Sequence, residues 1–507
     1  MSDDSSNALG RGQVRGSTLL VLGRGTSMVI GMATQVIIVR VLTKEDFGAF
    51  AYAIALAAGA RTLLSLGQGR LLSQFLARYE EERDYARMFG AMLLTVGTIA
   101  VTSVIVIGAF FLFTGSIVGD ELDSPALLHL ILILIFLSPL EALDQVFVSL
   151  FAVFSAPRAI FLRKYLMAPS IRLIVVVILA VTGASVRLLA IGYVVGGLLG
   201  LLLYTYLLLK ALKERGLLKE LRRSRVIIPY RAVLGFSLPL LTGELALLSF
   251  TVGGVVVLGL FHPIEQVANY RAVFSSARLN TAVSASFTTL FLPTMAKLHA
   301  RGDAAGLRNT YWHTAAFVAV FTFPVFALTG PLAPATTVAL FGQRYSESAL
   351  ILSTLAVGYY VNVILGFNTY TLQVCGRVRY LVVVNVFTAA LNIGLCFALA
   401  PAHGALGVAM ANCIALVVQN LLNQAALRRS IRTSWLGRSS WGCYAAIVAV
   451  SAALYLFQRL ASPGLVLSLT AAAVGAGLVL VLSAPALRLK ETFPELQRLP
   501  IIRRVVR

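Results

Sequence analysis

The chain has 507 residues, of which 58% are hydrophobic and only 12% are charged. Together with a mean hydropathy of +0.86, this composition excludes an ordinary soluble globular protein and indicates an integral membrane protein. The formal net charge of +21 raises the question of nucleic acid, but the cations lie in short loops between apolar runs, where lipid headgroups are the expected neighbours. We therefore predict membrane lipids, and no nucleic acid, as partners.

Apolar runs of about 20 residues, the length that crosses a bilayer as a helix, recur along the whole chain. Fourteen spans are predicted, at 17–41, 47–77, 87–114, 125–154, 165–184, 187–210, 232–260, 266–296, 310–332, 346–373, 379–399, 404–427, 440–458 and 463–485. The strands of a membrane barrel would instead be short segments of alternating polarity. The predicted fold is therefore an all-α integral membrane protein with about 14 transmembrane helices.

An internal repeat relates the first six spans to the next six. The exit from span 1 reads "VRVLTKEDFGAFAYA", the exit from span 7 reads "LGLFHPIEQVANYRA", and Phe50 aligns with Tyr270. Because six is an even number, the two halves share one orientation and are related by a pseudo-twofold axis along the membrane normal. The cleft between two such lobes is the natural path of a substrate.

The repeat and the loops define the predicted domains. These are a cytoplasmic N-terminus (1–16), an N-lobe of spans 1–6 (17–210), a basic cytoplasmic linker (211–231), a C-lobe of spans 7–12 (232–428), spans 13 and 14 (440–485) and a basic cytoplasmic tail (486–507). The linker and the tail are amphipathic, and we expect them to lie on the anionic inner leaflet.

The orientation follows from the cations, because cytoplasmic loops carry the excess of Lys and Arg. If both termini are cytoplasmic, only five cations fall in exterior loops or helix ends, namely Lys44, Arg187, Arg271, Arg344 and Arg459. The three tryptophans then fall at the cytoplasmic edge, as expected of an aromatic belt; they are Trp312, Trp435 and Trp441.

The loops leave no room for a soluble catalytic domain, since the longest of them is 211–231. Asp120, Glu121 and Asp123 form the densest exterior acidic cluster, but no histidine accompanies them, and a solvated loop is the better interpretation. A Walker A sequence is missing, and the four cysteines show no CxxC spacing. We predict a protein that is not an enzyme and has no metal site, disulfide or bound cofactor.

Charged residues nevertheless lie inside the predicted spans. The basic ones are Arg24, Arg40, Arg61, Arg70, Arg172 and Arg278, and the acidic ones are Glu141, Asp144 and Glu244. Arg40 is close enough to a helix end to reach the interface, but each of the others costs about 2.5–3.5 kcal/mol or more at the bilayer centre. They must pair internally or line a water-filled cavity. Five deep arginines exceed three acids, which favours a cationic cavity that binds an anion.

Helical spacing predicts two polar faces, Arg61, Ser65 and Gln68 in span 2, and Arg271, Ser275, Arg278 and Thr281 in span 8. Arg70 falls on the opposite face of span 2 unless Gly67 and Gly69 distort the helix.

Two carboxylates in span 4 are candidates for ion coupling. Glu141 and Asp144 are three residues apart and so face the same way. Their repulsion in a low dielectric favours the binding of a proton or a cation. We hypothesise that they, together with Glu244, couple transport to H⁺ or Na⁺. The alternative is that they neutralise arginines of the N-lobe.

Three segments carry a resemblance to a known family. They are the first hairpin, "VRVLTKEDFGAFAYAIAL … SLGQGRLLSQFLARY", the opening of span 7, "LGFSLPLL", and span 8, "ANYRAVFSSARL … FLPTMAKLHARGD". These motifs resemble the polysaccharide exporters of the multidrug/oligosaccharidyl-lipid/polysaccharide (MOP) superfamily. The resemblance implies a flippase that moves an undecaprenyl-diphosphate-linked oligosaccharide, such as an O-antigen, capsule or exopolysaccharide repeat unit, across a bacterial plasma membrane by alternating access.

The substrate implied by the resemblance accounts for the arginines, because guanidinium groups bind phosphate oxygens at two points and stay charged in a dry site. Arg61 and Arg278 lie near mid-membrane, one in each lobe, and are predicted to bind the diphosphate. Arg24, Arg70 and Arg172 lie nearer the cytoplasm, where the substrate would enter.

The polar face that includes Gln68 is suited to sugar hydroxyl groups. Three alternatives stay open: a lipid II flippase, a multidrug extruder similar to the MATE transporters, and a non-transporting scaffold of a polysaccharide assembly complex. In a scaffold, the buried arginines would have no purpose beyond pairing. The expected partners are the lipid-linked oligosaccharide and, beside the protein, a polysaccharide polymerase and glycosyltransferases.

Overall fold

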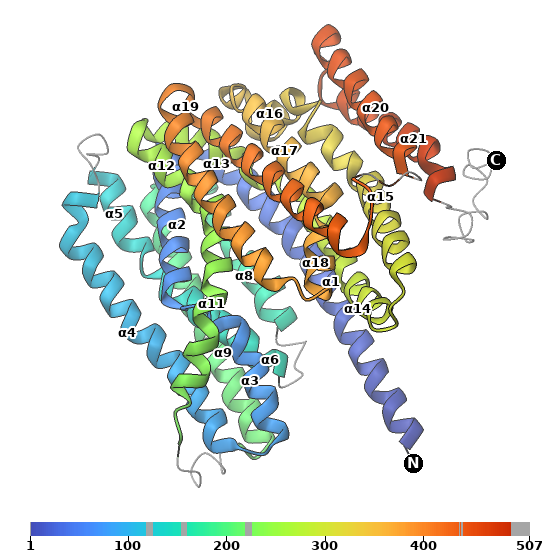
Figure 1. Ribbon diagram of the computed structural model, residues 1–507. Helices are drawn as coiled ribbons and strands as arrows, with labels where there is room; N and C mark the ends of the chain where they lie inside the picture. The colour runs from blue at the N-terminus through green and yellow to red at the C-terminus, as the bar shows by residue number, and fades with distance from the viewer. Residues whose placement is uncertain are drawn as a thin grey trace. The chain divides into compact units, whose positions relative to one another are not determined.

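The computed structural model describes residues 2–117, 125–153, 160–217, 226–435, 437 and 440–487 (Figure 1). Within these ranges every regular element is a helix and no strand occurs. Twelve helices are long and apolar enough to cross a membrane. The predicted all-α membrane fold is therefore confirmed.

Thirteen of the fourteen predicted spans fall on these twelve helices, and the remaining one, 266–296, falls on helices that are not among the twelve. The 54-residue helix α19 (Val378–Ile431) contains the predicted spans 379–399 and 404–427, and non-helical angles at Gly404 (φ 54°, ψ −134°) mark the kink between them. The predicted span 266–296 lies on two shorter helices, α13 (Ile264–Ala277) and α14 (Leu279–Ala300).

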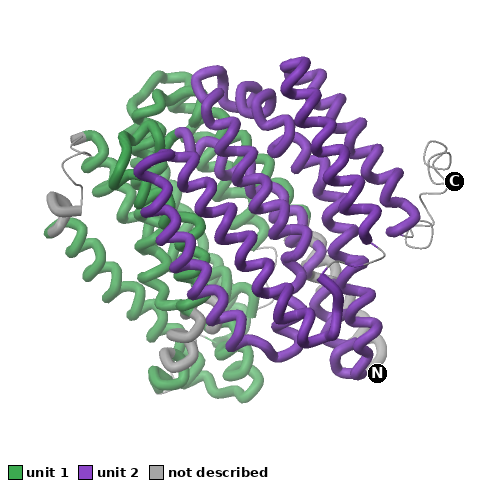
Figure 2. Tube along the Cα trace, turned by 45° about the horizontal axis from the view of Figure 1, so that its top comes forward, with its two compact units in different colours: residues 1–268 green, residues 269–507 purple. Residues whose placement is uncertain are grey.

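Packing divides the chain into two compact units, Met1–Ala268 and Asn269–Arg507 (Figure 2). Besides the start of α13, the first unit contains α1 (Ser2–Val41), α2 (Lys44–Leu64), α3 (Gln68–Glu81), α4 (Tyr85–Ile117), α5 (Pro125–Leu134), α6 (Leu137–Val153), the π-helix η2 (Phe161–Met167), α8 (Ala168–Thr182), α9 (Val186–Glu214), α11 (Tyr230–Leu248), the π-helix η3 (Ser249–Gly253) and α12 (Gly254–Phe261). The second unit contains the rest of α13, α14, α15 (Ala304–Thr329), α16 (Ala333–Phe341), the 3₁₀ helix η4 (Gln343–Tyr345), α17 (Ser348–Leu365), α18 (Phe367–Val374), α19, α20 (Trp441–Ala461) and α21 (Leu465–Leu487).

The unit boundary does not fall in the predicted linker 211–231. The helices of the seventh span, α11 and α12, pack against α2, and α11 also packs against α3. The seventh span is therefore part of the first compact unit. The predicted lobes, 17–210 and 232–428, stay a prediction, because compact units group helices by packing and not by repeat.

Breaks within the spans correct the predicted polar faces. Span 2 is interrupted between α2 and α3, where Leu66 (φ 44°) and Gly67 (φ 73°) adopt left-handed backbone angles. Glycine has no Cβ and takes such angles at little cost. Because the helix is broken there, Gln68 does not continue the helical face of Arg61 and Ser65, which lie on α2 and its C-cap. Span 8 is likewise interrupted at Arg278, between α13 and α14.

Each unit has its own buried core. In the first, Tyr204 of α9 is fully buried, with its ring centroid 5.1 Å from that of Phe151 on α6. In the second, Phe326 of α15 stacks on Tyr360 of α17 at 4.0 Å. Helix α21 packs along α15 and α20, and its Val479 and Leu487 are fully buried. The two C-terminal helices are thus part of the core of the second unit.

Candidate functional site

A polar cavity of about 420 Å³ lies inside the first unit. Helices α1, α2, α6, α8, α9 and η2 line it, and its charged residues are Arg61, Glu141, Asp144, Arg163, Lys164 and Arg172. In the described lining, four cations therefore face two carboxylates. Both carboxylates of span 4 line this one cavity, as expected from their spacing.

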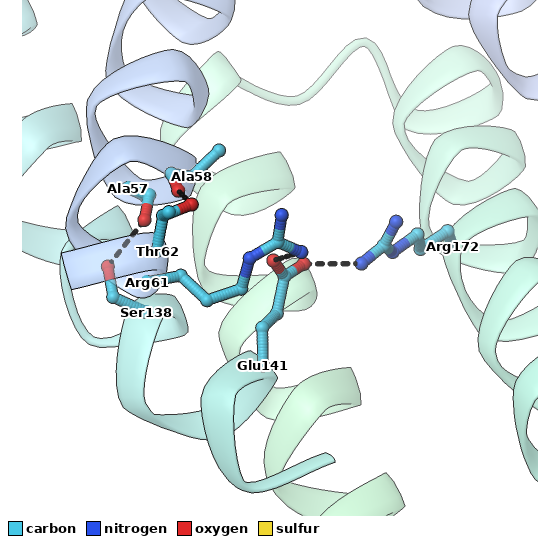
Figure 3. A network of polar contacts seen from close by, with 7 residues as sticks. All are labelled: Ala57, Ala58, Arg61, Thr62, Ser138, Glu141 and Arg172. Carbon is cyan, nitrogen blue, oxygen red and sulfur yellow. Dashed lines mark hydrogen bonds and ion pairs between the residues drawn. The ribbon is translucent and has the colours of Figure 1, made fainter. Parts of the chain in front are cut away.

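At the centre of the cavity, two arginines share one carboxylate (Figure 3). Arg61 Nη1 lies 3.2 Å from Glu141 Oε2, and Arg172 Nη2 lies 2.9 Å from Glu141 Oε1. The two guanidiniums approach from α2 and α8, on opposite sides of the carboxylate. The side chains of Arg61 and Arg172 are 44% and 46% exposed, whereas that of Glu141 is 25% exposed. The triad of Arg61, Glu141 and Arg172 therefore carries one net positive charge, and its two guanidiniums are accessible from the cavity.

Contacts with neighbouring residues hold the helices and side chains of the triad in place. Ser138, three residues before Glu141, donates a hydrogen bond from its hydroxyl to the carbonyl oxygen of Ala57, four residues before Arg61 (2.9 Å; Figure 3). This bond fixes the start of α6 against the last turns of α2. On the opposite side, the guanidinium of Arg172 lies 5.3 Å from the ring centroid of Tyr193 on α9, within the range of a cation–π interaction.

A second ion pair lies deeper in the helix packing. Arg163 Nη2 lies 3.0 Å from Asp144 Oδ1, and the Arg163 side chain is only 5% exposed. Its guanidinium also lies 5.5 Å from the ring centroid of Tyr204. A Cβ atom at Gly200 would collide with this guanidinium, so the absence of a side chain at Gly200 makes room for Arg163.

Arg163 was missed by the sequence analysis, because it falls between the predicted spans 125–154 and 165–184. The structure places it in η2, inside the candidate span Phe161–Thr182. Two signals point to this arrangement in hindsight. Arg163 is flanked by apolar residues in "IFLRKYLM", and Gly200 interrupts the bulky residues of "GGLLGLLL".

A smaller cavity of about 210 Å³ lies beside the first. Arg61 and Gln145 line both cavities, and Glu244 of α11 lines the smaller one. Arg61 is therefore positioned between the two cavities.

Of the remaining predicted site residues, Arg24 and Arg278 do not line either cavity. Arg24 is exposed on α1, three residues before the cavity-lining Ser27 and on the same side of the helix. Gln68 and Arg70 lie in α3, but their side chains are outside the part of the structure that is described. Arg278 belongs to the second unit, where its guanidinium lies 5.5 Å from the ring centroid of Phe274.

The candidate metal ligands of the chain are its histidine, cysteine and acidic side chains. Among the described residues, no three of these side chains form a group that could hold a metal ion.

A polytopic helical fold with charged residues around an internal cavity is typical of membrane transport proteins. The fold is similar to that of a structure described as "Lipid II flippase MurJ, inward closed conformation", with a TM-score of 0.71, 14% identity, and coverage of 93% of this chain and 98% of the other. It is also similar to structures of a multidrug resistance MATE family transporter of the MOP superfamily. The inward-facing conformation gives a TM-score of 0.66 at 14% identity, covering 81% of this chain and 98% of that one, and the outward-facing conformation gives 0.54 at 16%, covering 83% and 97%.

The sequence itself matches a family model described as "Polysaccharide biosynthesis protein" over residues 13–299, more than half of the chain. The chain therefore belongs to the polysaccharide biosynthesis protein family. The comparison with curated proteins found no match.

Proposed function

We propose that this protein is a flippase that moves an undecaprenyl-diphosphate-linked oligosaccharide across the bacterial plasma membrane by alternating access, with both termini in the cytoplasm. Membership of the polysaccharide biosynthesis protein family supports the class of substrate. The similarity of the fold to transporters described in inward-facing and outward-facing conformations supports the mode of movement. The proposal is of transport, not of catalysis.

The observation that carries the proposal is the sharing of Glu141 by Arg61 and Arg172. A cavity built only for internal pairing would give each guanidinium its own carboxylate. Here one positive charge is left over beside a carboxylate, and both guanidiniums remain partly exposed. A diphosphate is the kind of anion that planar guanidinium groups bind at two points.

Three other functions are weighed against this one. A lipid II flippase is the strongest, because the structure described as a lipid II flippase matches 93% of this chain. A multidrug extruder would transport organic cations, for which a cavity with four basic and two acidic residues is unfavourable. A non-transporting scaffold would not require its arginines to be accessible from a cavity.

Ion coupling is part of the proposal. We propose that Asp144 or Glu244 exchanges H⁺ or Na⁺ during transport, because Glu141 is already held by two guanidiniums. The direct partner of Asp144 is the buried Arg163, so protonation of Asp144 would remove the counter-charge of a buried cation and loosen the contact between α6 and η2. A polysaccharide polymerase and glycosyltransferases are the proposed neighbours in the membrane.

The test is complementation of a flippase-null strain, with surface polysaccharide and membrane abundance measured for Arg61→Ala, Arg61→Lys, Arg172→Ala and Arg278→Ala. We expect each alanine variant to reach the membrane and to lose polysaccharide. Lysine at position 61 should rescue only part of the loss, because an ammonium keeps the charge but not the two-point geometry.

Normal polysaccharide from both Arg61→Ala and Arg172→Ala would exclude binding of the anion by the triad. Loss of polysaccharide together with loss of protein would assign the arginines a structural role. Complementation of a strain that lacks its lipid II flippase, but not of one that lacks an oligosaccharide flippase, would favour the lipid II alternative.

A further inference from the structure

A third polar pocket, of about 720 Å³, lies in the second unit and shares no lining residue with the two cavities of the first unit. It is enclosed by the start of α15, the described residues between α19 and α20, and the end of α21. Its lining residues are Arg308, Asn309, Thr310, Trp312, His313, Thr314, Arg432, Thr433, Ser434, Gly437, Ser440 and Ala486. This described lining contains two arginines and several hydroxyl groups, but no Asp or Glu.

The walls of the pocket are held by specific contacts. Trp312 donates a hydrogen bond from Nε1 to the hydroxyl of Thr433 (2.8 Å), and Arg308 Nη1 donates to the carbonyl oxygen of Ile431 (3.3 Å). His313 Nε2 lies 3.0 Å from the carbonyl oxygen of Leu487 at the end of α21. The end of α19, the start of the connector between α19 and α20, and the end of α21 are therefore fixed to α15, and the pocket is a built feature of the unit.

Three features give the pocket an affinity for an anion. The guanidiniums of Arg308 and Arg432 supply positive charge, and Arg432 is held at the end of α19 with a left-handed φ of 49°. The N-terminus of α20 opens beside the pocket at Ser440, whose side chain does not cap the helix. Helix N-termini present free backbone N–H groups and a partial positive charge. Together, these groups match the oxygens of a phosphate.

The surroundings indicate that the phosphate belongs to a lipid. Trp435 lies between the lining residues Ser434 and Gly437, and Trp441 follows the lining residue Ser440. Their side chains are 46% and 56% exposed, and exposed indole rings are typical of the membrane interface. The parts of α20 and α21 next to the pocket carry exposed apolar side chains, such as Val448 (68%) and Leu482 (56%). Acyl chains can lie against this apolar surface while the headgroup occupies the pocket.

We propose that this pocket binds the phosphate headgroup of an anionic glycerophospholipid at the cytoplasmic membrane interface. The charge distribution of the sequence assigns these helix ends to the cytoplasmic side, where anionic lipids are abundant. The bound lipid joins α15 to the C-terminal helix pair. The proposal is independent of the transported substrate, because none of its residues lines the cavity of the first unit.

The experiment uses the purified full-length protein and measures its thermal unfolding during titration with phosphatidylglycerol. Phosphatidylcholine with the same acyl chains and inorganic phosphate serve as the other two probes. We expect phosphatidylglycerol to raise the Tm of the wild type. In the double variant Arg308→Gln/Arg432→Asn, the lipid concentration for half of the maximal shift should rise about tenfold or more, because charge-assisted hydrogen bonds are lost. Asn is chosen at position 432 because it tolerates left-handed angles.

The charge control is Arg377→Gln, which removes an exposed arginine that does not line the pocket and should leave the titration unchanged. A second pair of variants keeps both arginines, so its result does not depend on whether their removal affects folding. Asn309→Glu places a negative charge at the exposed edge of the pocket and should weaken the lipid response. Gln373→Glu makes the same amide-to-carboxylate change at an exposed site elsewhere and should not.

Equal titrations for the wild type, the double variant and Asn309→Glu would overturn the proposal. It would also be overturned if phosphatidylcholine were as effective as phosphatidylglycerol. A full shift by inorganic phosphate at the concentration at which the lipid acts would overturn the assignment to a lipid.

Discussion

The same substitution at two arginines of the cavity should have opposite consequences, because their side chains differ in burial. The Arg163 side chain is 5% exposed and lies 3.0 Å from Asp144. The Arg61 side chain is 44% exposed, and its partner Glu141 keeps a second guanidinium if Arg61 is removed. The perturbation is Arg→Ala at each position in turn.

The magnitudes follow from these environments. Removing one partner of a buried ion pair costs about 3–5 kcal/mol, since the other charge is left uncompensated. The Asp144 side chain is 26% exposed, so we expect the loss of unfolding free energy in Arg163→Ala to lie near the lower end of that range. A partly exposed ion pair contributes about 0–1 kcal/mol, so Arg61→Ala should change the free energy of unfolding very little.

The assay is thermal unfolding of the purified protein, combined with membrane abundance and surface polysaccharide in the complemented strain. Arg163→Ala should lower both the Tm and the abundance. Arg61→Ala should preserve both and abolish polysaccharide export. The double variant Arg163→Ala/Asp144→Ala should recover part of the lost stability, because it leaves no unpaired buried charge.

Equal losses of Tm in the two single variants would refute the reasoning from burial. A double variant no more stable than Arg163→Ala would show that the pair does not determine the stability of the contact between α6 and η2.

Three further predictions concern the backbone, the coupling and the topology. Gly200→Ala should destabilise the protein in thermal unfolding, because its methyl group would displace the buried guanidinium, whereas Gly108→Ala, which has open space around it, should be tolerated. Asp144→Asn should make flux in vesicles independent of an H⁺ or Na⁺ gradient that drives the wild type, and wild-type flux indifferent to both gradients would contradict ion coupling. In a cysteine-free background, a cysteine at His403 should react with an impermeant thiol reagent in intact cells, and one at Arg223 should not; labelling of position 223 from outside would reverse the topology.

The positions of the helices could be predicted from the sequence because the bilayer sets their length. A run of apolar residues has to extend far enough to cross the hydrocarbon core, and this requirement is visible without any partner. The breaks within spans were harder to predict. Gly67 was recognised as a residue that permits distortion, but the adjacent left-handed angle at Leu66 depends on the packing around it.

The presence of charged residues in a cavity could be predicted from the sequence, but the ion pairs that they form could not. The excess of arginines over acids inside the spans was visible in the sequence, as was the common direction of Glu141 and Asp144. The contact between Arg172 and Glu141 joins residues 31 positions apart, and its formation depends on how α8 packs beside α6. Arg163 was placed outside the predicted spans because two adjacent cations beside an apolar run are typical of a loop. In the structure both cations lie on the π-helix η2, and Arg163 is buried in the helix packing.

The structure also bears on whether the arginines inside the spans pair internally or bind an anion. Internal pairing and anion binding were treated as alternatives, yet Glu141 allows both at once. An incoming phosphate can take the guanidinium of Arg61 or Arg172 while the carboxylate keeps the other, so neither charge is left alone in the low dielectric. The cost of opening such a triad is lower than that of breaking a simple buried pair such as Arg163–Asp144. The first arrangement therefore suits a site that binds and releases an anion repeatedly, and the second suits a contact between helices that loosens only when Asp144 loses its charge.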